Sequence, residues 1–204
     1  MGLLYQICKK GAFAYYSIFF KLEVEGLEQV DTTRNYVVCA NHLNVNDPFI
    51  LGGLLPFETR FMAKKELFKY KIVAAFLGKI GVFPVERDAN DLKAIKVALT
   101  VLKNKGSLGL FPEATRNKGY EPLAVKAGVA MLAIKTKTPV LPITIDSHFK
   151  FWGPVRVVFH HPVELDHYYD QKTDTEELER ISQEIVNGLY SDMKYYKPLL
   201  DKPQ

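Results

Sequence analysis

The chain has 204 residues, a length that fits one domain around a single core. Apolar types make up 48% of it and charged types 25%, which excludes wholesale disorder, collagen-like repeats and coiled coil. The formal net charge of +4 is too small to indicate nucleic-acid binding, and the two cysteines, Cys8 and Cys39, form neither a disulfide framework nor a CxxC pair. We therefore expect a reducing compartment.

Residues 1–22 are apolar and cationic, with three lysines and no acid before Glu23. Their longest uncharged stretch, residues 11–20, is too short for a membrane-spanning helix, which needs about 20 apolar residues. The segment also lacks a signal-peptidase site and a myristoylation motif. Two interpretations stay open: an amphipathic helix lying in the membrane interface, or a helix that covers the soluble core.

Strands and helices alternate along the rest of the chain. Apolar runs and their periodicity predict strands at residues 36–40, 60–63, 82–85, 107–111, 140–145 and 154–160, and helices at 47–55, 64–79, 88–105, 125–136 and from 173 onward. A break in the second helix is expected near Tyr70. The alternation predicts a single α/β domain, residues 23–204, with a mixed, largely parallel central sheet flanked by helices, preceded by the amphipathic segment 1–22.

Helix ends and faces can also be predicted. Asp47 before Pro48 is typical of an N-cap followed by proline at the first helical position, and the sequence Thr-Asp-Thr-Glu at residues 173–176 is typical of a capping box. In the helix at 88–105, apolar residues three or four positions apart predict one inward face. Those residues are Leu92, Ile95, Leu99 and Leu102.

A polar loop follows the first predicted strand, and ligands gather at the carboxyl ends of parallel strands. In this loop His42 and Asp47 are five positions apart, close enough for the carboxylate to accept from one imidazole nitrogen. The other nitrogen would then be free as a general base, with a pKa ordinarily near pH 7. The alternative is a structural histidine beside a helix cap, and a carboxylate can fill both roles.

Cationic residues follow three other predicted strands. Glu113, Thr115 and Arg116 bring an acid, a hydroxyl and a guanidinium into one turn, which suits a phosphorylated ligand, and Arg87 follows the strand at 82–85. The segment 60–79 has six basic residues, Lys65 among them, against one acid. A solvated face explains that run, and so does contact with anionic headgroups.

These stretches together resemble the glycerolipid acyltransferase family, and most closely its 1-acyl-sn-glycerol-3-phosphate acyltransferases. The resemblance rests on four segments in the family's order: NHxxxxD at residues 41–47, the GxxFxxxR-like segment at 81–87, FPEATR at 111–116 and VLPI at 140–143. It covers over half of the chain. The resemblance implies the fold of that family and transfer of an acyl group from a thioester, acyl-CoA or acyl carrier protein, to the sn-2 hydroxyl of lysophosphatidate, which gives phosphatidic acid.

The resemblance also implies site roles. His42 is the general base and Asp47 its orienter; Arg87, Arg116 and Lys65 hold the substrate phosphate. Glu113, Ala114 and Thr115 form the acceptor site and the oxyanion donors, and the acyl-donor region contains Pro142, Lys126 and Gly128. The family has glycine where this chain has Ala114, so we expect Ala114 to donate its N–H with an ordinary φ.

The implied partners are a lysophospholipid, an acyl carrier and an anionic membrane surface, with the protein peripheral on the cytoplasmic face of the cell membrane. No metal or other cofactor is expected, because a thioester is already activated, and no nucleic acid is expected, because the net charge is small. His160 and His161 are adjacent on a strand and should point to opposite faces. Two alternatives stay open: acylation of another lysolipid or of glycerol 3-phosphate, and a non-catalytic module that binds anionic lipid.

Overall fold

The computed structural model describes residues 2–86, 91–119 and 121–196. Its strands are β1 (Lys21–Glu25), β2 (Val37–Ala40), β3 (Thr59–Lys64), β4 (Phe83–Val85), β5 (Ser107–Leu110), β6 (Val140–Asp146) and β7 (Pro154–Phe159). Its helices are α1 (Leu3–Phe19), α2 (Asp47–Leu54), α3 (Lys71–Lys79), α4 (Leu92–Lys103), α5 (Gly128–Thr136) and α6 (Thr175–Ser191). Short 3-10 helices are η1 (Leu27–Gln29), η2 (Lys65–Lys69) and η3 (Asp166–Tyr168), and η2 and α3 are divided at Tyr70, as predicted.

The strands form one seven-stranded sheet in the order β1-β7-β6-β2-β5-β3-β4. Every neighbouring pair is parallel except β6 and β7, which are antiparallel. The predicted mixed, largely parallel sheet is therefore confirmed. Because β6, β2, β5, β3 and β4 run in the same direction, the loops after them leave from one edge of the sheet, which we call the carboxyl edge.

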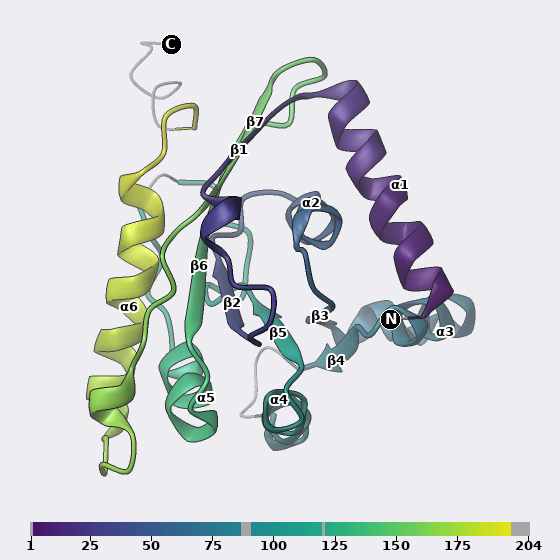
Figure 1. Cartoon of the computed structure of the whole chain (residues 1–204). Coiled ribbons are helices and arrows are strands. Elements are labelled where there is room, and N and C mark those ends of the chain that lie inside the picture. The colour runs from purple at the N-terminus through teal and green to yellow at the C-terminus, as the bar shows by residue number, and fades with distance from the viewer. Residues whose placement is uncertain (1, 87–90, 120, 197–204) are drawn as a thin grey trace.

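Helices cover both faces of the sheet (Figure 1). Alternate residues of β2 show how the faces divide: Val37 and Cys39 pack with α4, α5 and α6, whereas Val38 and Ala40 pack with α1 and α2. All four side chains are fully buried, as expected for a strand between two helical layers. Each layer buries its own apolar cluster, so the sheet is held rigidly and its carboxyl edge can position a site.

The predicted face of α4 is wrong at Leu92, which is 75% exposed. Asp91 caps this helix by accepting from the backbone N–H groups of Lys93 and Ala94, both at 3.0 Å. The helix therefore begins at Leu92, and its buried face contains Ala94 and Ala98 together with Val101 and Leu102. Small alanines let the helix approach the sheet closely, a packing effect that apolar periodicity does not reveal.

Three other helix starts differ from the prediction. Asn46 occupies the N-cap position of α2 without a capping hydrogen bond from its side chain, and the Asp47 carboxylate turns back into the preceding loop. The residue that caps α6 is Asp174, whose side chain accepts from the N–H of Glu177, so Thr173 is not the cap. Helix α5 begins at Gly128, three residues later than expected. Of these three helices only α6 has a capping hydrogen bond from the side chain at its N-cap position, so side-chain type alone does not fix where the helices begin.

Residues 1–22 contribute both a helix and the start of a strand. Helix α1 packs on α2 and buries Tyr5 and Tyr16, while its opposite face leaves Leu3, Ile7 and Ile18 more than half exposed. Strand β1 begins at Lys21, so the proposed boundary after residue 22 falls inside the sheet. In the described part of the chain, no helix has both the length and the apolar character needed to cross a bilayer.

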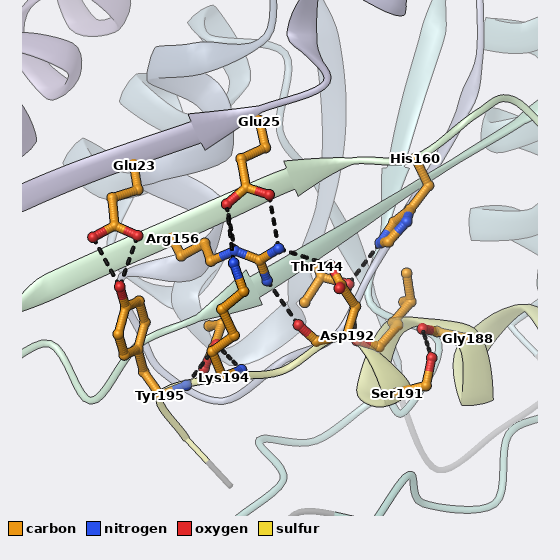
Figure 2. Close-up of polar contacts among 12 residues, drawn as sticks. Glu23, Glu25, Thr144, Arg156, His160, Gly188, Ser191, Asp192, Lys194 and Tyr195 are labelled. Carbon is orange, nitrogen blue, oxygen red and sulfur yellow. Dashed lines mark hydrogen bonds and ion pairs between the residues drawn. The ribbon is translucent and has the colours of Figure 1, made fainter. Parts of the chain in front are cut away.

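The segment after α6 is held to the sheet by a polar network (Figure 2). Arg156 on β7 is 2% exposed and donates two hydrogen bonds to Glu25, at 2.6 and 2.8 Å, and one to the Asp192 carbonyl at 2.7 Å. The buried Asp146 carboxylate accepts from the backbone N–H groups of residues 194–196. These bonds tie the end of α6 to three strands, which fixes the position of that helix.

His160 lies beside this network (Figure 2). Thr144 donates its hydroxyl proton to the Leu189 carbonyl at 2.8 Å, so it accepts from Nε2 of His160, also at 2.8 Å. Burial lowers the pKa of His160, which keeps the ring neutral. His161 is exposed, so the two rings lie in different surroundings, and among the described residues no group of three His, Cys, Asp or Glu side chains could hold a metal ion.

Candidate active site

His42 and Asp47 lie at the carboxyl edge, immediately after β2. The His42 Nδ1 atom is 2.8 Å from Oδ2 of Asp47, and the two residues are 9% and 0% exposed. The same carboxylate oxygen accepts from the backbone N–H groups of Leu43 and Asn44, both at 2.7 Å. Because an ionised carboxylate only accepts, Nδ1 carries the proton and Nε2 presents its lone pair. No residue in the described part of the chain hydrogen-bonds to Nε2.

Asp47 has few hydrogen-bond donors around it besides His42. Burial raises the pKa of Asp47, and the hydrogen bonds from His42, Asn44 and Leu43 oppose that rise. Its second oxygen, Oδ1, is buried and has no hydrogen-bond partner among the described residues. The imidazole is therefore the only side chain that hydrogen-bonds to this buried carboxylate in the described structure.

The backbone of His42 is held from both sides by the loop after β5. Its N–H donates to Oε2 of Glu113 at 3.1 Å, and its carbonyl accepts from the N–H of Asn117 at 2.7 Å. The ring of Phe111 stacks on the imidazole, with centroids 4.4 Å apart and planes inclined by 28°. Two adjacent strand ends therefore fix the position and the plane of the catalytic candidate.

Glu113 is the centre of this clamp. Its carboxylate is 6% exposed and accepts from the hydroxyl of Tyr190 at 2.7 and 2.8 Å, from the Asn117 side chain at 2.9 Å and from the Leu123 N–H at 3.2 Å. Burial, and then the neighbouring Glu113, raises the pKa of Tyr190, so its hydroxyl stays a donor. We expected Glu113 in the acceptor site; the structure places it behind His42, with its oxygens occupied by protein donors.

Ala114 differs from expectation in its backbone. Its φ is +55°, in the left-handed region that favours glycine, so the expected ordinary φ is wrong. Its N–H donates to the Phe111 carbonyl at 3.0 Å, and the N–H of Thr115 donates to the Glu113 carbonyl at 2.7 Å. Both expected oxyanion donors are therefore already paired within this turn. The alanine and the threonine are exposed at the surface of the turn.

The expected phosphate-binding cations follow neighbouring strands. Arg116, after β5, is exposed and has no hydrogen-bond or ion-pair partner in the described structure. Lys65, directly after β3, is exposed and forms an ion pair with Glu86, the residue after β4. Arg87 lies outside the described residues. Since β5, β3 and β4 are parallel neighbours, Arg116 and Lys65 belong to the same edge as His42.

The expected acyl-donor residues are dispersed. Pro142 is buried on β6, where it pairs with Cys39 of the neighbouring strand β2. Cys39 comes shortly before the loop that contains His42. Gly128 is the first residue of α5, and Lys126 before it is exposed. In the first turn of α5, the Ala130 N–H donates to the buried hydroxyl of Ser182 at 3.1 Å, so α6 satisfies a donor that we expected to be available to an anion.

Three of the residues that position His42 were not predicted: Phe111 as a stacking partner, Asn117 and Tyr190. Asn117 follows the FPEATR segment directly, and a polar residue there is a usable signal. Tyr190 is far away in the sequence and looks like any apolar position of α6, so no sequence pattern indicates its role.

A cavity of about 660 Å³ lies at the edge of the sheet opposite the carboxyl edge, lined by Asn35, Gly106 and other residues that precede strands. It does not include His42.

The positive φ of Ala114 generates a prediction about stability. Ala114→Gly should raise the free energy of unfolding by about 1 kcal/mol, because relief of the left-handed strain exceeds the added entropy of the unfolded chain. Chemical denaturation measures the change, and Ala75→Gly, at an exposed position of helix α3, is the control, expected to lower stability by about 1 kcal/mol. Equal losses for both variants would contradict the strained conformation of Ala114.

The chain is similar to known acyltransferases. Residues 21–146 match the family model described as Acyltransferase. The 1-acyl-sn-glycerol-3-phosphate acyltransferase of Bacillus subtilis (strain 168) is 33% identical over 140 residues, which cover 68% of this chain and 69% of that protein. The protein of the same name from Borreliella burgdorferi is 35% identical over 133 residues, 61% of this chain and 51% of its own length.

A solved structure agrees in fold. The crystal structure of the 1-acyl-sn-glycerophosphate (LPA) acyltransferase PlsC from Thermotoga maritima superposes with a TM-score of 0.72 at 28% identity, over 94% of this chain and 80% of that one. The family match includes β2, the His42–Asp47 loop and the segment after β5 that holds it. This chain therefore belongs to the acyltransferase family.

Proposed function

We propose that this protein transfers a fatty acyl group from a thioester carrier to the free sn-2 hydroxyl of 1-acyl-sn-glycerol-3-phosphate and so forms phosphatidic acid. The names of the relatives from Bacillus subtilis and Borreliella burgdorferi support this reaction. The observation that carries the proposal is the 2.8 Å contact between Nδ1 of His42 and the buried Asp47, which leaves Nε2 as a base.

The reaction needs one proton relay. Nε2 of His42 takes the proton of the acceptor hydroxyl as its oxygen attacks the thioester carbonyl, and the imidazolium is stabilised by Asp47. When the carbon–sulfur bond of the tetrahedral intermediate breaks, the sulfur leaves and takes that proton. The products are an ester and a free thiol, with no covalent acyl-enzyme. A thioester is already activated, so alignment of the two substrates supplies most of the remaining barrier reduction.

The substrates are assigned to different parts of the carboxyl edge. Arg116, Lys65 and Arg87 hold the phosphate of the acceptor. In the sequence they come after β5, β3 and β4, which lie in that order on one side of β2 and run parallel to it. The acyl donor, acyl-CoA or acyl carrier protein, lies toward Pro142 and the start of α5. We place the protein peripherally on the cytoplasmic face of the cell membrane, with α1 in the interface. The exposed apolar residues of α1 and the exposed Lys10 support this placement.

The proposal predicts the effect of removing the base. His42→Ala should lower kcat by on the order of 10³-fold, because the variant lacks the imidazole that takes the hydroxyl proton. Transfer from a labelled acyl carrier to lysophosphatidate measures it, and His161→Ala, an exposed histidine after β7, is the control. A wild-type protein that binds vesicles but acylates neither lysophosphatidate, other lysolipids nor glycerol 3-phosphate would instead be a lipid-binding module.

The phosphate assignment makes a second prediction. Arg116→Ala should raise KM for the phosphorylated acceptor by about tenfold and leave KM for the acyl donor nearly unchanged, because the guanidinium contacts the phosphate in ground and transition states alike. Lys118→Ala removes an exposed cation two positions away and should change neither constant. Equal increases in both KM values for Arg116→Ala would contradict the assignment.

The clamp on His42 gives a third prediction, for a positioning residue. Tyr190→Phe removes the hydroxyl that bonds both Glu113 oxygens and should lower kcat on the order of tenfold with little change in KM, because the loop that orients the imidazole loosens. Tyr195→Phe also removes a hydroxyl that donates to a carboxylate, that of Glu23, but outside the site, and should leave kcat unchanged. If both variants lose the same activity, Tyr190 is only structural.

A further inference from the structure

The loop between β6 and β7 exposes aromatic side chains to solvent. In this hairpin tip, residues 147–153, Phe151 is 62% exposed and Trp152 is 59% exposed. The backbone of the tip is strained, with φ of +48° at the half-buried Phe149 and +61° at Trp152, in the left-handed region that favours glycine. Trp152 is also the single tryptophan of the chain.

The hairpin tip is attached to the last turn of α1. The Trp152 N–H donates to the Phe19 carbonyl at 2.9 Å, and the rings of Phe19 and Phe151 are 5.4 Å apart. One turn earlier, the Tyr16 hydroxyl donates to Oδ1 of Asn46, in the loop of the candidate base, at 3.0 Å. The tip and the end of α1 therefore form one unit beside the carboxyl edge of the sheet.

A second exposed apolar element leaves the same edge. Helix α3 follows β3 through η2, and none of its residues is buried. Ile72 is 86% exposed and Phe76 is 42% exposed. Figure 1 shows α1 and α3 at the right of the view and the hairpin tip at the top, beside the end of α1, all away from α5 and α6. We call this side the α1–α3 surface.

Charge identifies what covers the α1–α3 surface. Its three segments, residues 3–19, 71–79 and 147–153, contain lysines but no aspartate or glutamate. A second copy of the chain would bring lysines against lysines, whereas anionic lipid headgroups attract them. Tyrosine, tryptophan and lysine around apolar side chains are the composition that favours the interface between headgroups and acyl chains.

Beyond the placement of α1 in the interface, we propose that the hairpin tip and α3 also enter it, so that the protein docks on an anionic lipid bilayer through the whole α1–α3 surface. The inference rests on the proposed function, since the acceptor is a membrane lipid. Docking in this orientation turns the carboxyl edge, with His42 and Arg116, toward the headgroups. The acceptor phosphate then reaches the site without leaving the interface.

Trp152 reports on the tip directly. Vesicles of phosphatidylcholine with phosphatidylglycerol should shift its fluorescence to shorter wavelength and protect it from acrylamide, and lipids brominated on the acyl chain should quench it. Vesicles of phosphatidylcholine alone should do less. Unchanged emission and full acrylamide access with bound anionic vesicles would overturn the placement of the tip. A shift that depends on protein concentration without lipid would assign the surface to a second copy.

Single substitutions test both ends of the surface. Phe151→Ser and Ile72→Ser should each weaken co-sedimentation with the anionic vesicles by about fivefold to tenfold, whereas Leu92→Ser, which changes an exposed leucine on α4, should not. Thermal unfolding should be the same for all three. If Ile72→Ser matches Leu92→Ser, α3 does not dock. A water-soluble, short-chain lysophosphatidate distinguishes the failure of one proposal from the failure of the other, because it reaches the site without a membrane. If the protein does not acylate this substrate but brominated lipid still quenches Trp152, the proposed function is wrong and the docking surface stands.

Discussion

The hydrogen bond between His42 and the buried carboxylate of Asp47 is the contact on which the site depends. A carboxylate without solvent is costly, and here it is compensated by two backbone N–H groups and one imidazole. That demand fixes the tautomer of His42 and keeps Nε2 available. The sequence predicted this contact, but its prediction that Asp47 also caps α2 is wrong, because the carboxylate accepts from the loop before the helix and Asn46 occupies the N-cap position.

The sheet supplies the rest of the geometry. Parallel neighbours β2 and β5 bring two loops together, so Phe111 can stack on the imidazole while Glu113 and Asn117 hold its backbone. The carboxylate of Glu113 also accepts a hydrogen bond from the hydroxyl of Tyr190, so α6 helps to support the site. The network around Arg156 fixes the end of α6 in turn (Figure 2). Tyr190, on the last helix, thus helps to hold the loop that contains His42.

Much of this could be predicted from the sequence where the signal is local. The strand order along the chain, the layering and the pairing of His42 with Asp47 follow from apolar runs and from spacing, and the structure confirms the sheet and the contact. Residue spacing could not predict the surroundings of His42. The positive φ of Ala114 depends on how its turn closes, and Tyr190 reaches Glu113 only because α6 packs there. The phosphate-binding role of Arg87 stays a prediction.

The most direct test of the central claim is the kcat of Asp47→Asn at saturating acyl donor and lysophosphatidate. Asparagine keeps the size of the side chain but removes the charge that orients and stabilises the imidazolium. The account predicts a fall in kcat on the order of 10³-fold, with KM for the acceptor unchanged and the protein still folded by circular dichroism. A folded variant that retains the wild-type kcat would show that the contact between His42 and Asp47 is structural and that another group takes the proton.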